Sequence, residues 1–216
     1  MEKTREITVK GIGNLKIPAD WIVIKVSLVE KNCDYEKGFS NFENNFSKLQ
    51  DAIITAGFEK KDLKTTAFSV STDYKNVKKQ NEYIRVLDGY IFRNELKIEF
   101  TFDAKKVNDV LKALHNSGVT TEIDISFTVQ DKEAVVNKLL YAATQNAREK
   151  AKTLCDAMGV KLGKLVTINY NWTEIDIYST AKYERDSECL YAPFYDISPD
   201  DVSVNEDAVF VWEITD

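Results

Sequence analysis

The sequence predicts an α/β protein of the α+β type, with a mixed, largely antiparallel sheet and three main helices. Two periods alternate along the 216 residues. Some stretches carry apolar side chains at every second position, as strands do, and longer ones carry them every third or fourth position, as helices do. Several of the expected strands are joined by short links, which favours antiparallel neighbours. This alternation places helices on at least one face of a sheet.

The expected strands are short segments with alternating apolar residues. The first covers residues 6–10 and is expected to end in a tight turn made by Gly11 and Gly13. Residues 75–82 are polar and are expected at an exposed hairpin tip, and Asp88-Gly89 is a turn signal. The remaining strands are expected at residues 21–29, 65–74, 90–102, 122–129, 165–170 and 208–214.

The three helices are expected at residues 35–56, 104–117 and 131–158. The first has a largely aromatic stripe at helical spacing, which is typical of a core-facing surface. Asp103 and Asp131 stand where they can cap the second and third helices. Each helix is followed by a glycine and an apolar residue, a pattern typical of helix C-caps.

The third helix contains a ridge of small residues at every fourth position, where a neighbouring backbone can approach closely. The ridge consists of Ala143, Ala147, Ala151 and Cys155. Residues 56–70 also echo residues 117–129, since in each a helix end and a glycine precede a Phe-Ser-Val or Phe-Thr-Val strand. We interpret this echo as an internal duplication of a strand–helix–strand unit.

The charge is unevenly distributed. The net charge is −6 and the pI is about 5.1, and the absence of a basic stripe argues against nucleic acid as a partner. Residues 184–207, the acidic segment, hold eight acids and one base, so the rest of the chain is close to neutral. This segment is either a solvated loop or an acidic contact surface or cation site.

Residues 171–206 form an irregular, acidic and aromatic arm, which we call the 171–206 arm. Long irregular segments in compact domains are uncommon and often functional. The arm is expected either to fold over its own sheet or to pack on a neighbouring subunit, where aromatic residues are enriched. Its aromatic residues are Trp172, Tyr178, Tyr183, Tyr191, Phe194 and Tyr195.

No set of residues specifies a reaction, so the sequence predicts no catalytic, cofactor-binding or metal site and no cofactor. Gly11-Ile12-Gly13 resembles the start of a dinucleotide fingerprint, but Lys16 occupies the third glycine position and a strand follows. His115, the only histidine, is expected to interact with the C-terminal dipole of its helix rather than to act as a general base.

The three cysteines are widely separated and contain no CxxC motif, which argues against a zinc site. Cys155 is expected to be a buried small residue, and Cys189 lies among acids that disfavour a thiolate. Cys33, close to Lys31, is the better candidate for a redox thiol.

An oxygen-rich cluster precedes the last strand and lacks the ligand order of a calcium loop. It is expected to be a charged turn, with weak cation binding as the alternative. The cluster consists of Asp200, Asp201, Asn205, Glu206 and Asp207.

Taken in order, several short motifs resemble those of the SIMPL domain family, a bacterial family of unknown function. They cover residues 5–214, with Pro18-Ala19-Asp20 in place of the family's Pro-Asp pair. The resemblance implies one α/β domain over residues 1–216, large homo-oligomers and no established active site. The motifs are Val9-Lys10-Gly11-Ile12-Gly13 with Pro18, Lys61 to Thr65 before a strand ending at Tyr74, Gly89-Tyr90 with Asn94, the Ala-rich helix with Met158-Gly159 and Leu162-Gly163, and Pro199 before the last strand.

The expected function is therefore that of a non-enzymatic binding or assembly protein whose partner is itself. A small-molecule hydrolase or a thiol-dependent redox enzyme is the alternative. The first residues lack the apolar core of a signal peptide, and no segment is long and apolar enough to span a membrane. These features favour the cytoplasm, whereas the family resemblance implies the periplasm or cell envelope.

Overall fold

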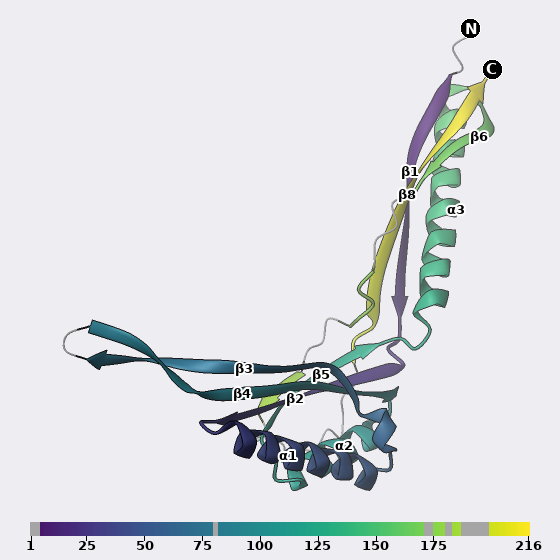
Figure 1. Cartoon of the computed structure of the whole chain (residues 1–216). Coiled ribbons are helices and arrows are strands. Elements are labelled where there is room, and N and C mark those ends of the chain that lie inside the picture. Colours follow the sequence, from purple (N-terminus) through teal and green to yellow (C-terminus); the bar gives the residue numbers. More distant parts are fainter. Residues whose placement is uncertain (1–4, 80–81, 171–174, 180–182, 187–198) are drawn as a thin grey trace. The chain divides into compact units, whose positions relative to one another are not determined.

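A computed structural model describes residues 5–79, 82–170, 175–179, 183–186 and 199–216. These residues form two antiparallel sheets and three α-helices, which confirms the α+β prediction (Figure 1). The helices are α1 (Tyr35–Thr55), α2 (Ala104–Asn116) and α3 (Lys132–Met158), with a short 3-10 helix η1 (Lys60–Asp62). The strands are β1 (Glu6–Ile17), β2 (Trp21–Asn32), β3 (Lys64–Lys79), β4 (Glu82–Thr101), β5 (Thr121–Thr128), β6 (Lys161–Asn169), β7 (Tyr183–Asp186) and β8 (Val202–Thr215).

The chain divides into two compact units, each with one of the sheets. The three-stranded unit comprises Met1–Ala19, Thr128–Thr180 and Asp200–Asp216, and the five-stranded unit comprises Asp20–Phe127 and Ala181–Pro199. The strands thus form two sheets where the sequence suggested one mixed sheet. The long α3 covers one sheet, and α1 with α2 covers the other.

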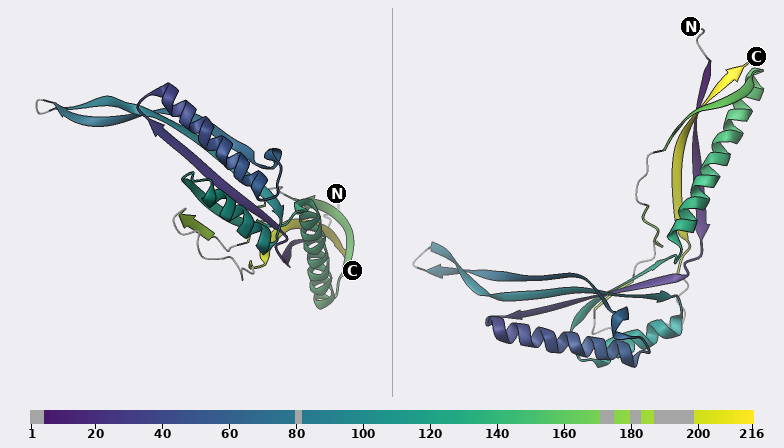
Figure 2. Two further views of the ribbon diagram at one scale, coloured as in Figure 1. Left: turned by 90° about the horizontal axis from the view of Figure 1, so that it is seen from below. Right: turned by 45° about the vertical axis from the view of Figure 1, so that its right-hand side comes forward.

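The five-stranded unit has the strand order β3-β4-β2-β5-β7. Without the short edge strand β7, its chain order β2-α1-β3-β4-α2-β5 is the split βαβ arrangement of ferredoxin-like folds. Helices α1 and α2 lie side by side on one face of this sheet (Figure 2). The two echoing stretches, residues 56–70 and 117–129, occupy equivalent places, each leading from a helix into a strand.

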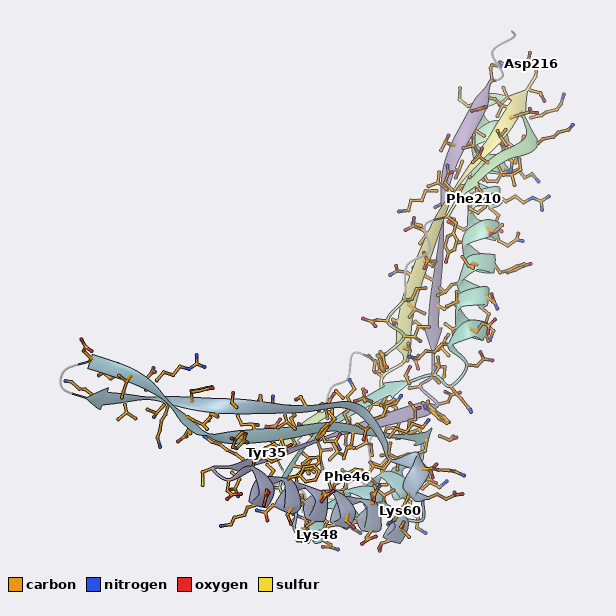
Figure 3. All side chains as sticks on the ribbon, viewed as in Figure 1. Tyr35, Phe46, Lys48, Lys60, Phe210 and Asp216 are labelled. Atoms are coloured by element: carbon orange, nitrogen blue, oxygen red, sulfur yellow. The ribbon has the colours of Figure 1, made fainter. Side chains whose placement is uncertain are left out.

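The core of the five-stranded unit lies between the sheet and its two helices. In α1 the middle of the aromatic stripe is buried, with Phe42, Leu49 and Ile53 in the core. Tyr35 and Phe39, at the start of the helix, remain substantially exposed. Figure 3 shows Tyr35 and Phe46 on the side of α1 that faces the sheet and Lys48 on the opposite side.

The predicted helix caps are confirmed. The carboxylate of Asp103 accepts hydrogen bonds from the backbone N–H groups of Lys105 and Lys106, and that of Asp131 accepts one from Ala134. Asp34 caps α1 in the same way, through a hydrogen bond from the backbone N–H of Lys37. The glycines that follow the three helices all have positive φ angles.

The three-stranded unit has the strand order β1-β8-β6, and α3 packs on one face of it. The ridge of small residues on α3 is buried as predicted, with Ala143, Ala147 and Ala151 fully inaccessible. Ala147 and Ala151 share a cluster with Val9 of β1 and the large side chains Phe210 and Trp212 of β8. Small residues on the helix thus face large residues on the last strand.

Gly11 and Gly13 do not form the expected turn, because β1 continues straight through both. A Cβ atom on Gly11 would lie 2.1 Å from the carbonyl oxygen of Ala143, and one on Gly13 would lie 2.2 Å from that of Leu139. These glycines therefore let the backbone of α3 rest directly on β1. A glycine pair is typical both of a turn and of a close backbone contact, so the sequence alone could not distinguish the two.

The oxygen-rich cluster before the last strand is not a turn either, because β8 already begins at Val202. Alternation within a strand sends neighbouring side chains to opposite faces. Glu206 is buried on one face, whereas Asp207 on the other face forms an ion pair of 3.1 Å with Lys10. Among the described residues, no group of three or more His, Cys, Asp or Glu side chains could hold a metal ion.

Candidate functional site: a projecting hairpin

The most unusual surface of the five-stranded unit is the outer half of the β3–β4 hairpin, residues 74–87, which we call the projecting hairpin. β4 pairs with β2 only from Tyr90 to Thr101, whereas its pairing with β3 continues outward to Lys79↔Glu82. Figure 1 shows these two strands extending past the ends of β2 and α1. The strands thus continue through most of the expected polar tip.

The expected turn at Asp88-Gly89 is also absent, since β4 runs through both residues. Gly89 lies opposite Asp73, where the register shifts between Asp73 and Tyr74. A Cβ atom on Gly89 would lie 2.5 Å from the carbonyl oxygen of Asn32, at the end of β2. The glycine thus marks the place where the projecting hairpin leaves the sheet.

One face of the projecting hairpin combines aromatic and cationic side chains. The register places Tyr74 opposite Leu87 and Lys78 opposite Tyr83, with Asn76↔Arg85 between them. The guanidinium carbon of Arg85 lies 4.3 Å from the centre of the Tyr74 ring, a cation–π contact. Tyr83 is 73% exposed.

The opposite face of the projecting hairpin is more aliphatic. Val77 stands opposite Ile84, and both side chains are exposed. Val86 stands opposite Lys75 on the same face. Apolar side chains thus lie exposed on both faces, whereas a half-buried antiparallel strand normally has one apolar and one polar face.

Four charged residues hold the base of the projecting hairpin. Lys31, at the end of β2, places its Nζ atom 2.5 Å from Asp73 Oδ2 and 3.0 Å from Asp88 Oδ2. Lys75 adds a 2.6 Å contact from its Nζ atom to Asp88 Oδ1. We call this group the base clamp, because it ties β2 to both strands of the hairpin.

The base clamp shifts the titration of its members in the directions expected for ion pairs. Hydrogen bonding to Lys31 lowers the pKa of Asp73, and hydrogen bonding to Lys75 and then Lys31 lowers that of Asp88. The hydrogen bonds to Asp73 and Asp88 in turn raise the pKa of Lys31, and the bond to Asp73 contributes more. Opposite charges within hydrogen-bond reach favour the charged form of each group.

The two edge strands of the three-stranded sheet, β1 and β6, differ in how far other parts of the chain cover them. On β1 the backbone N–H of Ile12 donates to Asn146 Oδ1 of α3, and the carbonyl of Lys10 accepts from Lys150 Nζ. Side chains of α3 therefore cover the β1 edge, a recognised protection against unwanted pairing. At the other edge, β6 presents Leu165 and Ile168 with about half of each side chain exposed.

The structure does not gather the candidate catalytic residues into one described site. His115 lies half-buried in the last turn of α2, as expected. Cys155 is buried on α3 in the three-stranded unit, and Cys33 is exposed after β2. Lys31, expected to support a reactive Cys33, is instead engaged by Asp73 and Asp88. Cys189 lies outside the described residues.

The described parts of the 171–206 arm lie against their own chain. Ile177 is buried in a cluster with Val129, Leu139 and Val202. The hydroxyl of Thr128 donates to the carbonyl oxygen of Ile177. In the other unit, β7 pairs with Glu122–Ile125 of β5. Trp172, Tyr191, Phe194 and Tyr195 lie outside the described residues, so the choice between the arm's two expected positions stays open for them.

The sequence of this chain matches a known protein family. The profile of SIMPL, a protein of unknown function (DUF541), matches residues 7–205. The chain belongs to the SIMPL family. The resemblance drawn from the short motifs is thereby confirmed.

Two curated relatives carry the name 26 kDa periplasmic immunogenic protein, one from Brucella melitensis and one from Brucella abortus. Each is 27% identical over 164 residues, which is 76% of this chain. The match spans 65% of the length of each relative. In the described part of the SIMPL chain, no helix has the length and apolar character needed to cross a membrane.

Proposed function

We propose that this SIMPL chain is a non-enzymatic assembly protein that forms homo-oligomers through open edges and faces of its sheets. The observation that carries the proposal is the projecting hairpin. Its exposed apolar side chains on both faces contribute nothing to the cores of the two units. Exposed apolar surface rimmed by polar residues is typical of protein interaction sites.

The outer edge of β6, which pairs with no strand among the described residues, adds support. A strand with free N–H and C=O groups and exposed apolar side chains can accept another strand. The contrast with β1 matters here, because α3 covers the edge of β1 with Asn146 and Lys150. Nothing in the described residues favours the alternative of a hydrolase or thiol enzyme.

Light scattering on the purified protein at micromolar concentrations tests the proposal. We expect a mass of several chains. A variant in which Asn-Gly replaces residues 76–85 should have a lower mass and stay folded, because the described residues among them pair only with each other, beyond the part of β4 that pairs with β2. A monomer mass for the parent chain at both low and high salt would refute the proposal.

The compartment of this assembly is a separate question. The names of the two Brucella relatives place those proteins in the periplasm. We propose the periplasm, because the relatives match most of the chain. Fractionation of cells that express the natural gene should recover the protein with periplasmic markers, and recovery only with cytoplasmic markers would contradict this placement.

A further inference from the structure

We propose that the cationic, aromatic face of the projecting hairpin binds the acidic stretch that follows β7, residues 187–198, of a second copy of the chain. This inference rests on the proposed function and goes beyond it by naming both surfaces of one contact. It predicts a head-to-tail contact, in which each copy offers one hairpin and one acidic stretch.

The first argument is charge complementarity. Residues 74–87 contain four bases and one acid, a net charge of +3 in a chain whose overall charge is −6. Among the described residues, neither Arg85 nor Lys78 forms an ion pair with a carboxylate, and both side chains are exposed. Residues 184–201 contain six acids and one base. Complementary charges of this kind steer association and select partners.

The second argument is the match of apolar groups. The hairpin face offers Tyr74, Leu87 and Tyr83 around its two cations. The stretch 187–198 has no base, and its two acids, Glu188 and Asp196, flank a group of apolar and aromatic residues. Interface cores are enriched in tyrosine and phenylalanine, so each side supplies the residue types that the other can bury.

The third argument concerns the geometry of the sheet. β7 and β3 lie at opposite edges, four strand spacings apart. Crossing the sheet takes about 19 Å, or roughly six extended residues, before the chain even reaches the hairpin. Too few of the twelve residues would remain to cover the hairpin of the same copy. This favours a second copy as the source of the acidic stretch.

A symmetric contact between two hairpins is disfavoured for electrostatic reasons. Two copies of the same face would bring Arg85 and Lys78 against each other's like charges. A contact between unlike surfaces avoids this repulsion. Repeated head to tail, it closes into a ring or continues as an open chain.

Charge-reversal variants, measured by light scattering at low salt, test the contact. The hairpin variant carries Lys78→Glu and Arg85→Glu, and the stretch variant carries Glu188→Lys and Asp196→Lys. Each alone should dissociate, with a rise of roughly tenfold or more in the apparent dissociation constant. An equimolar mixture of the two should regain the parent mass, because each variant hairpin then faces a stretch of opposite charge.

A matched control carries Lys48→Glu and Lys112→Glu, which give the same charge change as the hairpin variant on exposed positions of α1 and α2. It should keep the parent mass. Circular dichroism checks that every variant is folded. If both reversal variants keep the mass of an oligomeric parent, the contact is refuted while the proposed function stands. If each dissociates and the mixture does not reassemble, the acidic stretch does not bind the hairpin of a second copy. A monomeric parent refutes both proposals.

Discussion

Asn94 stands in the inward-facing row of β4, between the buried apolar residues Phe92 and Leu96. Its Oδ1 atom is buried and accepts no hydrogen bond from any described residue, and its neighbours across the strands are Leu28 and Phe68. A buried amide oxygen without a hydrogen-bond partner costs more free energy than an apolar group of similar shape.

Asn94→Leu should therefore raise the free energy of unfolding by about 1–2 kcal/mol. Urea denaturation followed by circular dichroism measures the change. The control is the reverse exchange at the next inward-facing position of β4, Leu96→Asn, which should lower the free energy of unfolding. A clear loss of stability in Asn94→Leu would mean that the amide has a partner, such as a buried water, that stabilises the fold.

The base clamp should respond to pH at both ends of the scale. The carboxyl groups of Asp73 and Asp88 have pKa values below their ordinary 3.8, so their stabilising effect is complete well above pH 3.8 and is lost as the pH falls through the lowered values. Lys31 has a pKa above its ordinary 10.5, so its effect is complete below that pH and is lost as the pH rises through the raised value.

NMR titration of the aspartate side chains tests the carboxyl half of this expectation. In Lys31→Met the pKa of Asp73 should rise toward 3.8, because the lysine is the largest cause of its depression. The pKa of Asp88 should move less, since Lys75 still contacts it at 2.6 Å. An unchanged Asp73 pKa would show that the ion pair does not persist in solution.

At the scale of elements, the close contact between α3 and β1 depends on small residues on both sides. Ala147 is fully buried, and its Cβ would lie 2.7 Å from a Cβ on Gly11. Ala147→Leu should cost roughly 1–3 kcal/mol of unfolding free energy, because the added atoms force the helix away from the strand.

Chemical denaturation of Ala147→Leu beside Glu149→Leu separates this effect from a change in helix propensity, since Glu149 lies exposed on the same helix. Glu149→Leu should unfold near the denaturant concentration of the parent. If Ala147→Leu did so too, the ridge would not be a packing surface.

The elements that the sequence predicts well are those with a local signature. Helical spacing, the caps Asp103 and Asp131 and the glycines behind each helix are all properties of neighbouring residues, and the three helices lie within two residues of their predicted bounds. What Gly11 and Gly89 do depends instead on a strand or helix that is distant in sequence. In sequence both glycines are typical of turns, although in the structure each permits a close backbone approach.

The candidate site was harder to predict than the fold. The polar residues from Lys75 to Glu82 are typical of a loop, and only Val77 and the alternation of Ile84 and Val86 around Arg85 indicate that the strands continue. β7 was missed because four residues in an acidic segment carry too little pattern. The burial of the small-residue ridge, in contrast, could be predicted from its four-residue spacing, although that spacing does not tell a strand from a helix as its neighbour.

At the scale of the whole molecule, the two units differ in how many separate stretches of the chain form them. The five-stranded unit takes most of its residues from the continuous stretch Asp20–Phe127, whereas the three-stranded unit draws on three separate stretches. The expectation of a single domain over residues 1–216 stays a prediction, and this asymmetry offers a way to test it.

A fragment of residues 20–127 should fold alone, because it contains β2 to β5, both helices that cover them and the buried side chains between. It lacks β7, which pairs with only four residues of β5. Thermal unfolding by circular dichroism should be cooperative, and the amide NMR spectrum should be well dispersed. A fragment that aggregates or melts without cooperativity would instead support the single-domain expectation.

The projecting hairpin also has a consequence for how this protein can change over evolutionary time. Residues 76–85 lie beyond the base clamp and add nothing to either core, so substitutions there escape the folding constraint that limits most positions. Binding preferences can therefore be retuned at this place without loss of the native state. For the same reason its end is a suitable point for inserting an epitope or a fluorescent label, whose masking or quenching would then report on association directly.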